Sequence, residues 1–134
     1  MKKKRLTGFP RGVETILVVD DENTTIDVVR EMLCRFGYTI LTAEDGERAV
    51  EIYRSKEHLI DLVILDLNMP RMDGHACLRE LRKLNPDVKV IISSGYSSMV
   101  DAHNLLDSGA AAFMNKPYRL QEILHRLREI LDGI

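Results

Sequence analysis

The sequence predicts an α/β protein in which five parallel strands form a single sheet with helices on both faces. Short apolar runs alternate five times with segments whose apolar residues recur at helical spacing. The runs are rich in branched residues and lack a polar side, as in strands buried on both faces. The chain has 134 residues, of which 45% are hydrophobic and 30% charged, and this length suits one domain with one core.

The first strand is expected at residues 15–19, which form a continuous run of threonine and branched apolar residues. Apolar residues then recur at helical spacing between Ile26 and Phe36, which predicts a helix. Gly37 follows this segment, at a position where glycine commonly ends a helix. The second strand is expected after this glycine, at residues 38–43.

A second helix is expected to begin after Gly46 and to place Ala49, Val50 and Tyr53 on its apolar side. The third strand is expected at residues 62–65, an apolar run that ends next to an aspartate. Aspartate is a poor strand former, and its burial costs free energy unless another group pairs with it. This strand end therefore marks a candidate functional position.

The second half of the chain continues the same alternation of strands and helices. Apolar spacing over residues 77–84 predicts a third helix, which Asn85-Pro86 closes. Further strands are expected at residues 88–92 and 112–114, and further helices at residues 98–106, before Gly109, and 120–131. The last of these helices has the most regular apolar spacing.

Composition and charge limit the classes of function. The formal net charge of −2 gives no reason to expect direct binding of nucleic acid, and no apolar stretch is long enough to span a membrane. Residues 1–13 are expected to be a flexible N-terminal tail that precedes a domain at residues 14–134. Cys34 and Cys77 are expected to be small buried residues rather than disulfide or metal partners, which favours a cytoplasmic location.

The strand order places four acidic residues at one end of the sheet. In a parallel sheet of order 2-1-3-4-5 with right-handed crossovers, ligands bind beyond the carboxyl ends of the strands. The order of strands reverses between the first and the third, so the residues that follow these two strands line the expected site. They are Asp20, Asp21 and Glu22 after the first strand, and Asp66 after the third.

Three of these carboxylates, on Asp20, Asp21 and Asp66, are expected to converge. Like charges this close repel by on the order of several kcal/mol, so a bound cation or a raised pKa is required. Hard oxygen ligands with room for water suit Mg²⁺, with Mn²⁺ as an alternative. A role in capping the next helix would explain one of these acids well but three of them poorly.

Polar residues follow the fourth and fifth strands as well. Ser94 and Lys116 are expected at the same edge of the sheet as the three carboxylates. Each alone is a weak signal, because an exposed lysine is usually solvated. Together, a hydroxyl, an ammonium group and a metal ion are suited to neutralise and orient a phosphoryl group.

Four motifs in this order closely resemble those of a response-regulator receiver domain of two-component signal transduction. They are "ILVVDDE" at residues 16–22, "DLVILDLNMPRMDG" at 61–74, "IISSGY" at 91–96 and "FMNKPY" at 113–118. The resemblance implies a flavodoxin-like (βα)5 three-layer sandwich. It fits both a stand-alone receiver and the receiver segment of a hybrid sensor kinase.

The resemblance implies that Asp66 accepts a phosphoryl group from a histidine kinase, a phosphotransfer domain or a small donor such as acetyl phosphate. It implies that Mg²⁺ is held by Asp21 and Asp66 directly, and by Asp20 through water. The main-chain carbonyl of Asn68 would be a further ligand. Lys116 would pair with Asp66 and then with its phosphate. The chain would catalyse only its own phosphorylation and dephosphorylation and would not otherwise be an enzyme.

The resemblance also implies a conformational switch. Ser94 would bond the phosphoryl group, and the ring of Phe113 would rotate inward, although plain core packing explains this phenylalanine equally well. The face formed by residues 98–106, 112–114 and 120–131 would then repack. This face would bind a downstream protein or an attached domain, and it allows homodimerisation on phosphorylation.

Other functions are less compatible with the same residues. A Mg²⁺-dependent phosphatase with an aspartate nucleophile needs a second acid where this chain has Asn68, which cannot transfer a proton. A flavin carrier needs an uncharged phosphate loop where this chain has the acidic residues 20–22. A receiver-like module that only binds proteins would not need its acids, Ser94 and Lys116. The resemblance further implies a cis peptide between Lys116 and Pro117, although such bonds are usually trans.

Overall fold

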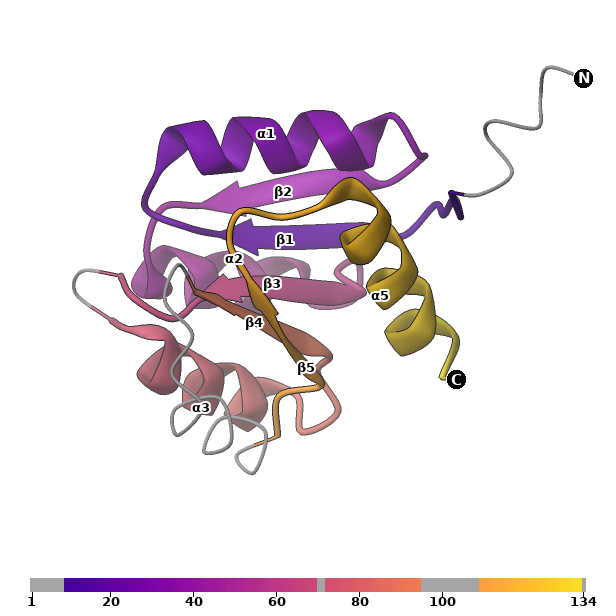
Figure 1. Cartoon of the computed structure of the whole chain (residues 1–134). Coiled ribbons are helices and arrows are strands. Elements are labelled where there is room, and N and C mark those ends of the chain that lie inside the picture. The colour runs from indigo at the N-terminus through magenta and orange to yellow at the C-terminus, as the bar shows by residue number, and fades with distance from the viewer. Residues whose placement is uncertain (1–8, 70–71, 95–108, 134) are drawn as a thin grey trace, which may run out of the picture.

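The computed structural model, which describes residues 9–69, 72–94 and 109–133, contains one sheet of five parallel strands (Figure 1). The strand order β2-β1-β3-β4-β5 confirms the predicted topology. The strands are β1 (Thr15–Val19), β2 (Thr39–Ala43), β3 (Leu62–Asp66), β4 (Val90–Ser94) and β5 (Ala112–Asn115). The described helices are α1 (Asn23–Cys34), α2 (Gly46–Lys56), α3 (Gly74–Leu84) and α5 (Leu120–Asp132). The helix predicted at residues 98–106 lies outside the described residues.

The sheet separates two apolar cores, because successive side chains of a strand point to opposite faces. Helices α2 and α3 cover one face of the sheet, and α1 and α5 cover the other (Figure 1). In β3, Val63 and Leu65 pack in the core of α2 and α3, whereas Leu62 and Ile64 pack in the core of α1 and α5. All five residues of β3 are buried. This burial on both sides explains why the sequence of the strand has no polar face.

Local sequence signals determine where the helices begin and end. Asp45 and Asp73 are the N-caps of α2 and α3, and their Oδ1 atoms accept hydrogen bonds from the backbone N–H groups of Arg48 at 2.8 Å and Ala76 at 3.0 Å. Between α1 and β2 the chain turns at Gly37. Its φ of 104° lies in the left-handed region, which only glycine adopts without strain.

Three strands reach further toward their carboxyl ends than the apolar pattern predicts, and β5 does so by one residue, to Asn115. β3 includes Asp66, and β4 continues through two serines to Ser94. Backbone pairing carries the sheet through these polar residues, since Asp66 pairs with Ser93 and Ser94 with Asn115. The polar side chains at this edge therefore belong to the rigid framework of the sheet.

The prediction that both cysteines are buried is correct for Cys77 and wrong for Cys34. Cys77 lies in the core with its Sγ 3.8 Å from the carbonyl oxygen of Gly46, whereas Cys34 is exposed at the end of α1. Leu33 occupies the buried position in this turn of α1. The next residue lies roughly 100° further around the helix, so the side chain of Cys34 faces away from the core.

No helix in the described part of the chain meets the requirements for crossing a membrane. A helical span needs about 20 consecutive apolar residues. The longest described helix, α5, has 13 residues and a charged outer face.

The burial pattern predicts different costs for two substitutions of the same type. Leu81 is fully buried in α3, whereas Leu59 is 51% exposed in the α2–β3 connection. We expect Leu81→Ala to lower the free energy of unfolding by about 2–5 kcal/mol, because it removes apolar contacts and leaves a cavity. The matched control Leu59→Ala should change it by less than about 0.5 kcal/mol. Urea unfolding of both variants measures the difference, and equal effects would contradict the described core.

Candidate functional site

Side-chain alternation places two aspartates on the same face of the sheet. Asp20 continues the row of β1 side chains that faces α1 and α5, as Asp66 does for β3. β1 and β3 are neighbours whose last registered pair is Val19 with Leu65. The next position along each chain is an aspartate, so the two carboxylates lie side by side at the sheet edge.

The structure brings together the three carboxylates that the sequence singles out. Asp20, Asp21 and Asp66 each offer an oxygen, and these oxygens all lie within 4.8 Å of one another. Asp20 and Asp66 are 1% and 4% exposed, whereas Asp21 is exposed. Two buried like charges at this separation require a nearby positive charge.

Lys116 supplies that positive charge. It follows β5, and its backbone N–H donates to the carbonyl of Ser94 at 2.8 Å, which extends the ladder between β4 and β5. Its Nζ lies 2.7 Å from Oδ2 of Asp20 and 3.3 Å from Oδ2 of Asp66. Glu22 is a more distant partner at 3.8 Å. The peptide bond between Lys116 and Pro117 is cis, as the resemblance implies.

The other carboxylate oxygens are held by their own loops. Oδ1 of Asp20 accepts a hydrogen bond from the backbone N–H of Glu22 at 2.9 Å, and Oδ1 of Asp66 accepts one from that of Asn68 at 3.3 Å. Both are bonds from an aspartate to the N–H two residues later, the pattern of an Asx-turn. The two loops thereby orient both Oδ2 atoms toward Lys116. The N-cap residue of α1 is Glu22, not Asp20. Asp20 therefore contributes to this helix start only by accepting the hydrogen bond from the N–H of Glu22.

The site changes the proton affinity of Asp66 and Lys116. Burial and the charge of Asp20 raise the pKa of Asp66 to about 6, against the lowering effect of Lys116. For Lys116, burial disfavours the charged form, but its contacts with Asp20 and Asp66 outweigh burial and raise its pKa to about 12. Lys116 therefore remains charged at neutral pH, whereas the carboxyl group of Asp66 titrates close to neutrality.

The donor set fits a hard divalent cation. Within the described residues, Oδ2 of Asp20 is buried and has no hydrogen bond of acceptable geometry, although Nζ of Lys116 lies 2.7 Å away. The contact with the lysine is thus an ion pair that leaves a lone pair of this oxygen unused. A buried oxygen beside two further carboxylates, one of them open to solvent, suits an ion with several oxygen ligands and bound water.

The serine and the amide at this edge are also in contact. Nδ2 of Asn68 lies 3.5 Å from Oγ of Ser94, at the limit of a hydrogen bond. Ser94 is 1% exposed, and it forms a further interaction in the structure. Asn68 also bonds Asp66 through its backbone N–H, and Ser94 directly follows Ser93, the residue that pairs with Asp66 across β3 and β4.

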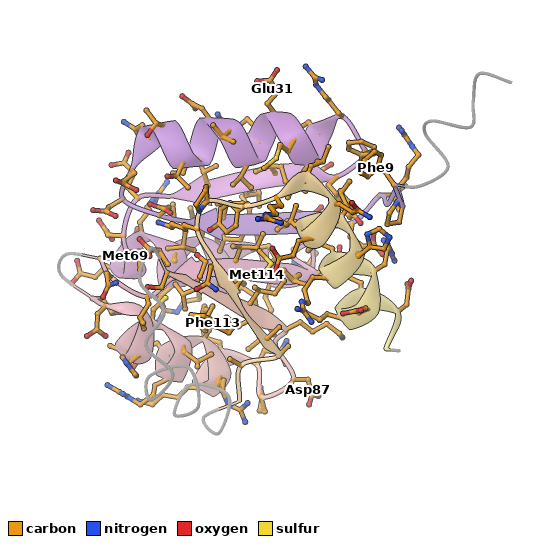
Figure 2. All side chains as sticks on the ribbon, viewed as in Figure 1. Phe9, Glu31, Met69, Asp87, Phe113 and Met114 are labelled. Carbon is orange, nitrogen blue, oxygen red and sulfur yellow. The ribbon has the colours of Figure 1, made fainter. Side chains whose placement is uncertain are left out.

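Phe113 is partly buried and packs against the core of α2 and α3, whereas its neighbour Met114 packs in the other core (Figure 2). The contact between Tyr118 and Ser93 was not predicted from the sequence. The hydroxyl of Tyr118 donates to Oγ of Ser93 at 2.7 Å and ties the segment after Lys116 to β4. A tyrosine two residues after the strand-end lysine was the available signal.

Comparison with known proteins agrees with this geometry. The sequence pattern described as the response regulator receiver domain matches residues 16–128. A segment of the sensor kinase CckA of Brucella abortus is 38% identical over 122 residues, which is 90% of this chain and 13% of the kinase. The probable transcriptional regulator ycf27 of Porphyridium aerugineum is 38% identical over 121 residues, 90% of this chain and 49% of the regulator. The chain thus spans about half or less of the length of these curated relatives.

Two solved structures are similar over nearly the whole chain. A response regulator receiver domain protein from Clostridium thermocellum has a TM-score of 0.86 and 30% identity, with 90% of this chain and 96% of that chain covered. A CheX-CheY-BeF3-Mg²⁺ complex from Borrelia burgdorferi has a TM-score of 0.84 and 32% identity, with 94% and 92% covered. These two matches show similarity of the fold, and the roles proposed for individual residues rest on this chain's own geometry.

The raised pKa of Asp66 predicts that its ionisation destabilises the metal-free protein. The folded protein holds this proton up to about pH 6, whereas the unfolded chain releases it near pH 4. Stability should therefore fall as the pH rises from 4 to 6, and the penalty should be fully present above pH 6. In EDTA at pH 7 we expect Asp66→Asn to unfold with a free energy about 1–3 kcal/mol higher than the parent.

Urea unfolding between pH 4 and pH 7 measures this difference. The advantage of Asp66→Asn should shrink toward pH 4, where the carboxyl of the folded parent is protonated and that of the unfolded chain is only partly ionised. Asp27→Asn, at an exposed position of α1, is the control and should show no such trend. An advantage that stays constant over this pH range would contradict the assigned ionisation.

Proposed function

The chain belongs to the response regulator receiver domain family of two-component signalling, and from this premise we propose that it is a phosphorylation-activated switch with Asp66 as the phosphoacceptor. The observation that carries the proposal is the placement of this one carboxylate. Asp66 is buried at the sheet edge beside a second buried acid, Asp20, and the ammonium group of Lys116 contacts both. An exposed surface aspartate would have neither the cation nor the converging acids.

The chemistry is a transfer of a phosphoryl group to a carboxylate oxygen. An oxygen of ionised Asp66 attacks phosphorus, the bond from phosphorus to the donor nitrogen or oxygen breaks, and the donor leaves with that electron pair. The product is an aspartyl phosphate, which Lys116 stabilises by pairing with the added negative charge. Hydrolysis of the same acyl phosphate returns Asp66. In this proposal the domain catalyses only these two reactions on itself.

We propose that Asp20, Asp21 and Asp66 hold Mg²⁺, with Mn²⁺ as an alternative. The main-chain carbonyl of Asn68 would add a ligand, and Asp20 would act through water. When bound, the ion supplies positive charge that lowers the repulsion between the acids and the incoming phosphoryl oxygens. The convergence of three carboxylates within 4.8 Å and the burial of Oδ2 of Asp20, which is ion-paired with Lys116, support this assignment.

A hollow beside Lys116 supports approach of a protein donor, a histidine kinase or a phosphotransfer domain. It is lined by Glu22, Thr24, Thr25, Val28, Lys116, Pro117 and Tyr118. Val28 is 54% exposed on α1, so the hollow combines an apolar wall with the edge of the charged site. An apolar surface that reaches Lys116, whose Nζ lies 3.3 Å from Oδ2 of Asp66, suits a partner that must bring its phosphohistidine within reach of Asp66.

We propose that the phosphoryl group is read out through Ser94 and Phe113. Ser94 lies on the same edge as Asp66, and Phe113 packs one strand further on, in β5. A shift of the serine toward the phosphate would let the ring change its packing, which requires two packings that differ by only a few kcal/mol. The partner face would include β5 and α5, and its third part, at residues 98–106, lies outside the described residues.

Acetyl phosphate provides a direct test. In the presence of Mg²⁺ we expect the intact mass of the parent to increase by one phosphoryl group, and we expect EDTA to prevent the increase. Asp66→Asn should gain no mass, whereas Asp27→Asn should behave like the parent. Adduct formation on Asp66→Asn would contradict the proposal, as would a parent that neither gains mass nor responds to beryllofluoride in NMR spectra.

The proposed metal site predicts a specific role for Asp21. This residue is exposed and lies among like charges, so Asp21→Asn should not lower the free energy of unfolding of the metal-free protein. Mg²⁺ affinity should nevertheless fall at least about tenfold, the loss that even outer-shell partners of metals cause. Calorimetric titration of Mg²⁺ into both proteins measures the change, and equal affinities would exclude Asp21 as a ligand.

A further inference from the structure

Residues 9–14, which we call the lead-in, contact the domain at the end of the sheet opposite the acidic site. Phe9 packs against the core of α1 and α5, and its ring lies 5.9 Å from that of Phe36. The guanidinium of Arg11 lies over the same ring at 5.7 Å. The backbone N–H of Gly12 donates to the carbonyl of Phe36 at 3.0 Å. The lead-in is thus held by a tilted contact between two aromatic rings, by a cation–π contact and by a backbone hydrogen bond.

Two glycines allow this close approach. A Cβ on Gly12 would lie 2.4 Å from the ring of Tyr38 and 2.5 Å from Nη1 of Arg128. A Cβ on Gly37, which has a φ of 104°, would lie 2.0 Å from the carbonyl oxygen of Gly12. Any side chain at either position would therefore push the lead-in away from the turn between α1 and β2. The close contact between the backbone of the lead-in and that of the turn therefore requires glycine at both positions.

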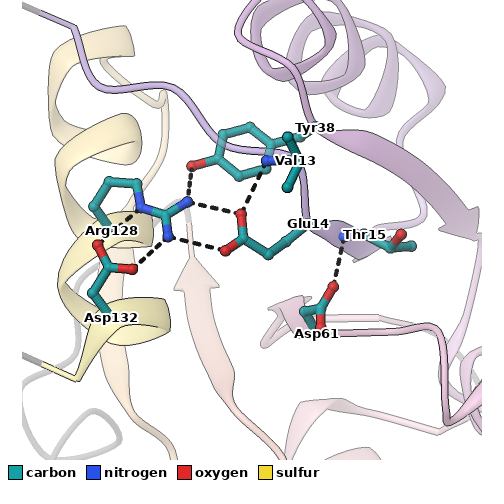
Figure 3. Close-up of polar contacts among 7 residues, drawn as sticks. All are labelled: Val13, Glu14, Thr15, Tyr38, Asp61, Arg128 and Asp132. Atoms are coloured by element: carbon teal, nitrogen blue, oxygen red, sulfur yellow. Dashed lines mark hydrogen bonds and ion pairs between the residues drawn. The ribbon is translucent and has the colours of Figure 1, made fainter.

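An ion pair then clamps the end of the lead-in to α5. Figure 3 shows the guanidinium of Arg128 between the carboxylates of Glu14 and Asp132. Nη1 and Nη2 of Arg128 donate to the two oxygens of Glu14 at 2.7 and 2.9 Å, a bidentate geometry, and Nη1 also donates to the hydroxyl of Tyr38 at 3.2 Å. The side chains of Arg128 and Glu14 are only 17% and 24% exposed.

This clamp differs from the other ion pairs on the described helices. Most of those join residues three or four apart on one helix, where an exposed pair contributes little. Glu14 and Arg128 are 114 positions apart and join the start of β1 to the last turns of α5. Arg128 also holds the pKa of Glu14 at about 2, so the pair stays charged at every ordinary pH.

We propose that the lead-in is a strap whose docking is coupled to the position of α5 through the clamp between Glu14 and Arg128. The clamp then fixes the position of the start of β1 relative to α5. A displacement of residues 9–13 changes the position of α5, and a displacement of α5 changes the docking of the strap, because such coupling is reciprocal. The proposal is independent of the assigned phosphoacceptor.

Amide hydrogen exchange of the full chain tests the coupling. In Glu14→Gln, we expect exchange to accelerate on the order of tenfold at the amide of Gly12 and in residues 125–132 of α5, because a bidentate charged contact is lost. Exchange in α3 should not change. Asp132→Asn is the matched control, because it removes the other carboxylate on Arg128 without touching the lead-in. It should leave the amide of Gly12 unaffected.

A second variant perturbs the strap without altering a charge. Gly12→Ala should accelerate exchange in the last turns of α5 as Glu14→Gln does, because the added Cβ crowds Arg128. Unchanged exchange in α5 for both variants would overturn the proposal. It would also be overturned by equal acceleration in α3, which would indicate global destabilisation, or by the same response at Gly12 to Asp132→Asn.

Discussion

The mutual repulsion of Asp20 and Asp66 is the constraint on which the rest of the site depends. Both carboxylates are buried, and each has one oxygen fixed by the loop that follows it. The remaining oxygens, Oδ2 of Asp20 and Oδ2 of Asp66, would repel each other. The ammonium group of Lys116 contacts both and offsets this repulsion. A single ammonium group does not neutralise three carboxylates, so the edge retains an excess of negative charge that favours a divalent cation.

The fold explains why these charges meet. Parallel strands deliver all their carboxyl ends to one edge, and the order β2-β1-β3-β4-β5 makes β1 and β3 neighbours although α1, β2 and α2 separate them in sequence. β5 lies two strands from β3, and the long side chain of Lys116 covers that distance. Such a buried charged cluster is weak evidence that the charges stabilise the fold, because taking charges out of water costs free energy that burial of apolar side chains does not. It is better explained as a site that functions through its charge.

The sheet, its strand order and the convergence of the acids could all be predicted, because apolar runs and strand-end residues are encoded locally. The lengths of β3 and β4 could not, since Asp66 and Ser93 are drawn into the ladder by pairing between strands and not by their own propensity. The exposure of Cys34 depends on which side of α1 faces the core, and neighbouring Leu33 takes that side. The roles assigned to Asp66, Ser94 and Phe113 stay predictions.

The contacts of the lead-in were equally invisible in the sequence. The sequence places Gly12 in the predicted flexible tail and Glu14 at the start of the predicted domain, and nothing local indicates that Glu14 pairs with Arg128, more than a hundred residues later. Long-range polar pairs of this kind depend on the complete tertiary structure. At the acidic edge, by contrast, the partners of Asp66 all follow strands, so the fold class alone was enough to bring them together.

Chemical trapping of the phosphorylated residue tests the central claim most directly. After incubation with acetyl phosphate and Mg²⁺, borohydride reduces an aspartyl phosphate to homoserine, and peptide mass spectrometry identifies the position. The account predicts homoserine at Asp66 alone, because this carboxylate is buried beside both Lys116 and Asp20. Homoserine at Asp20 or Asp21, with Asp66 unmodified, would contradict it.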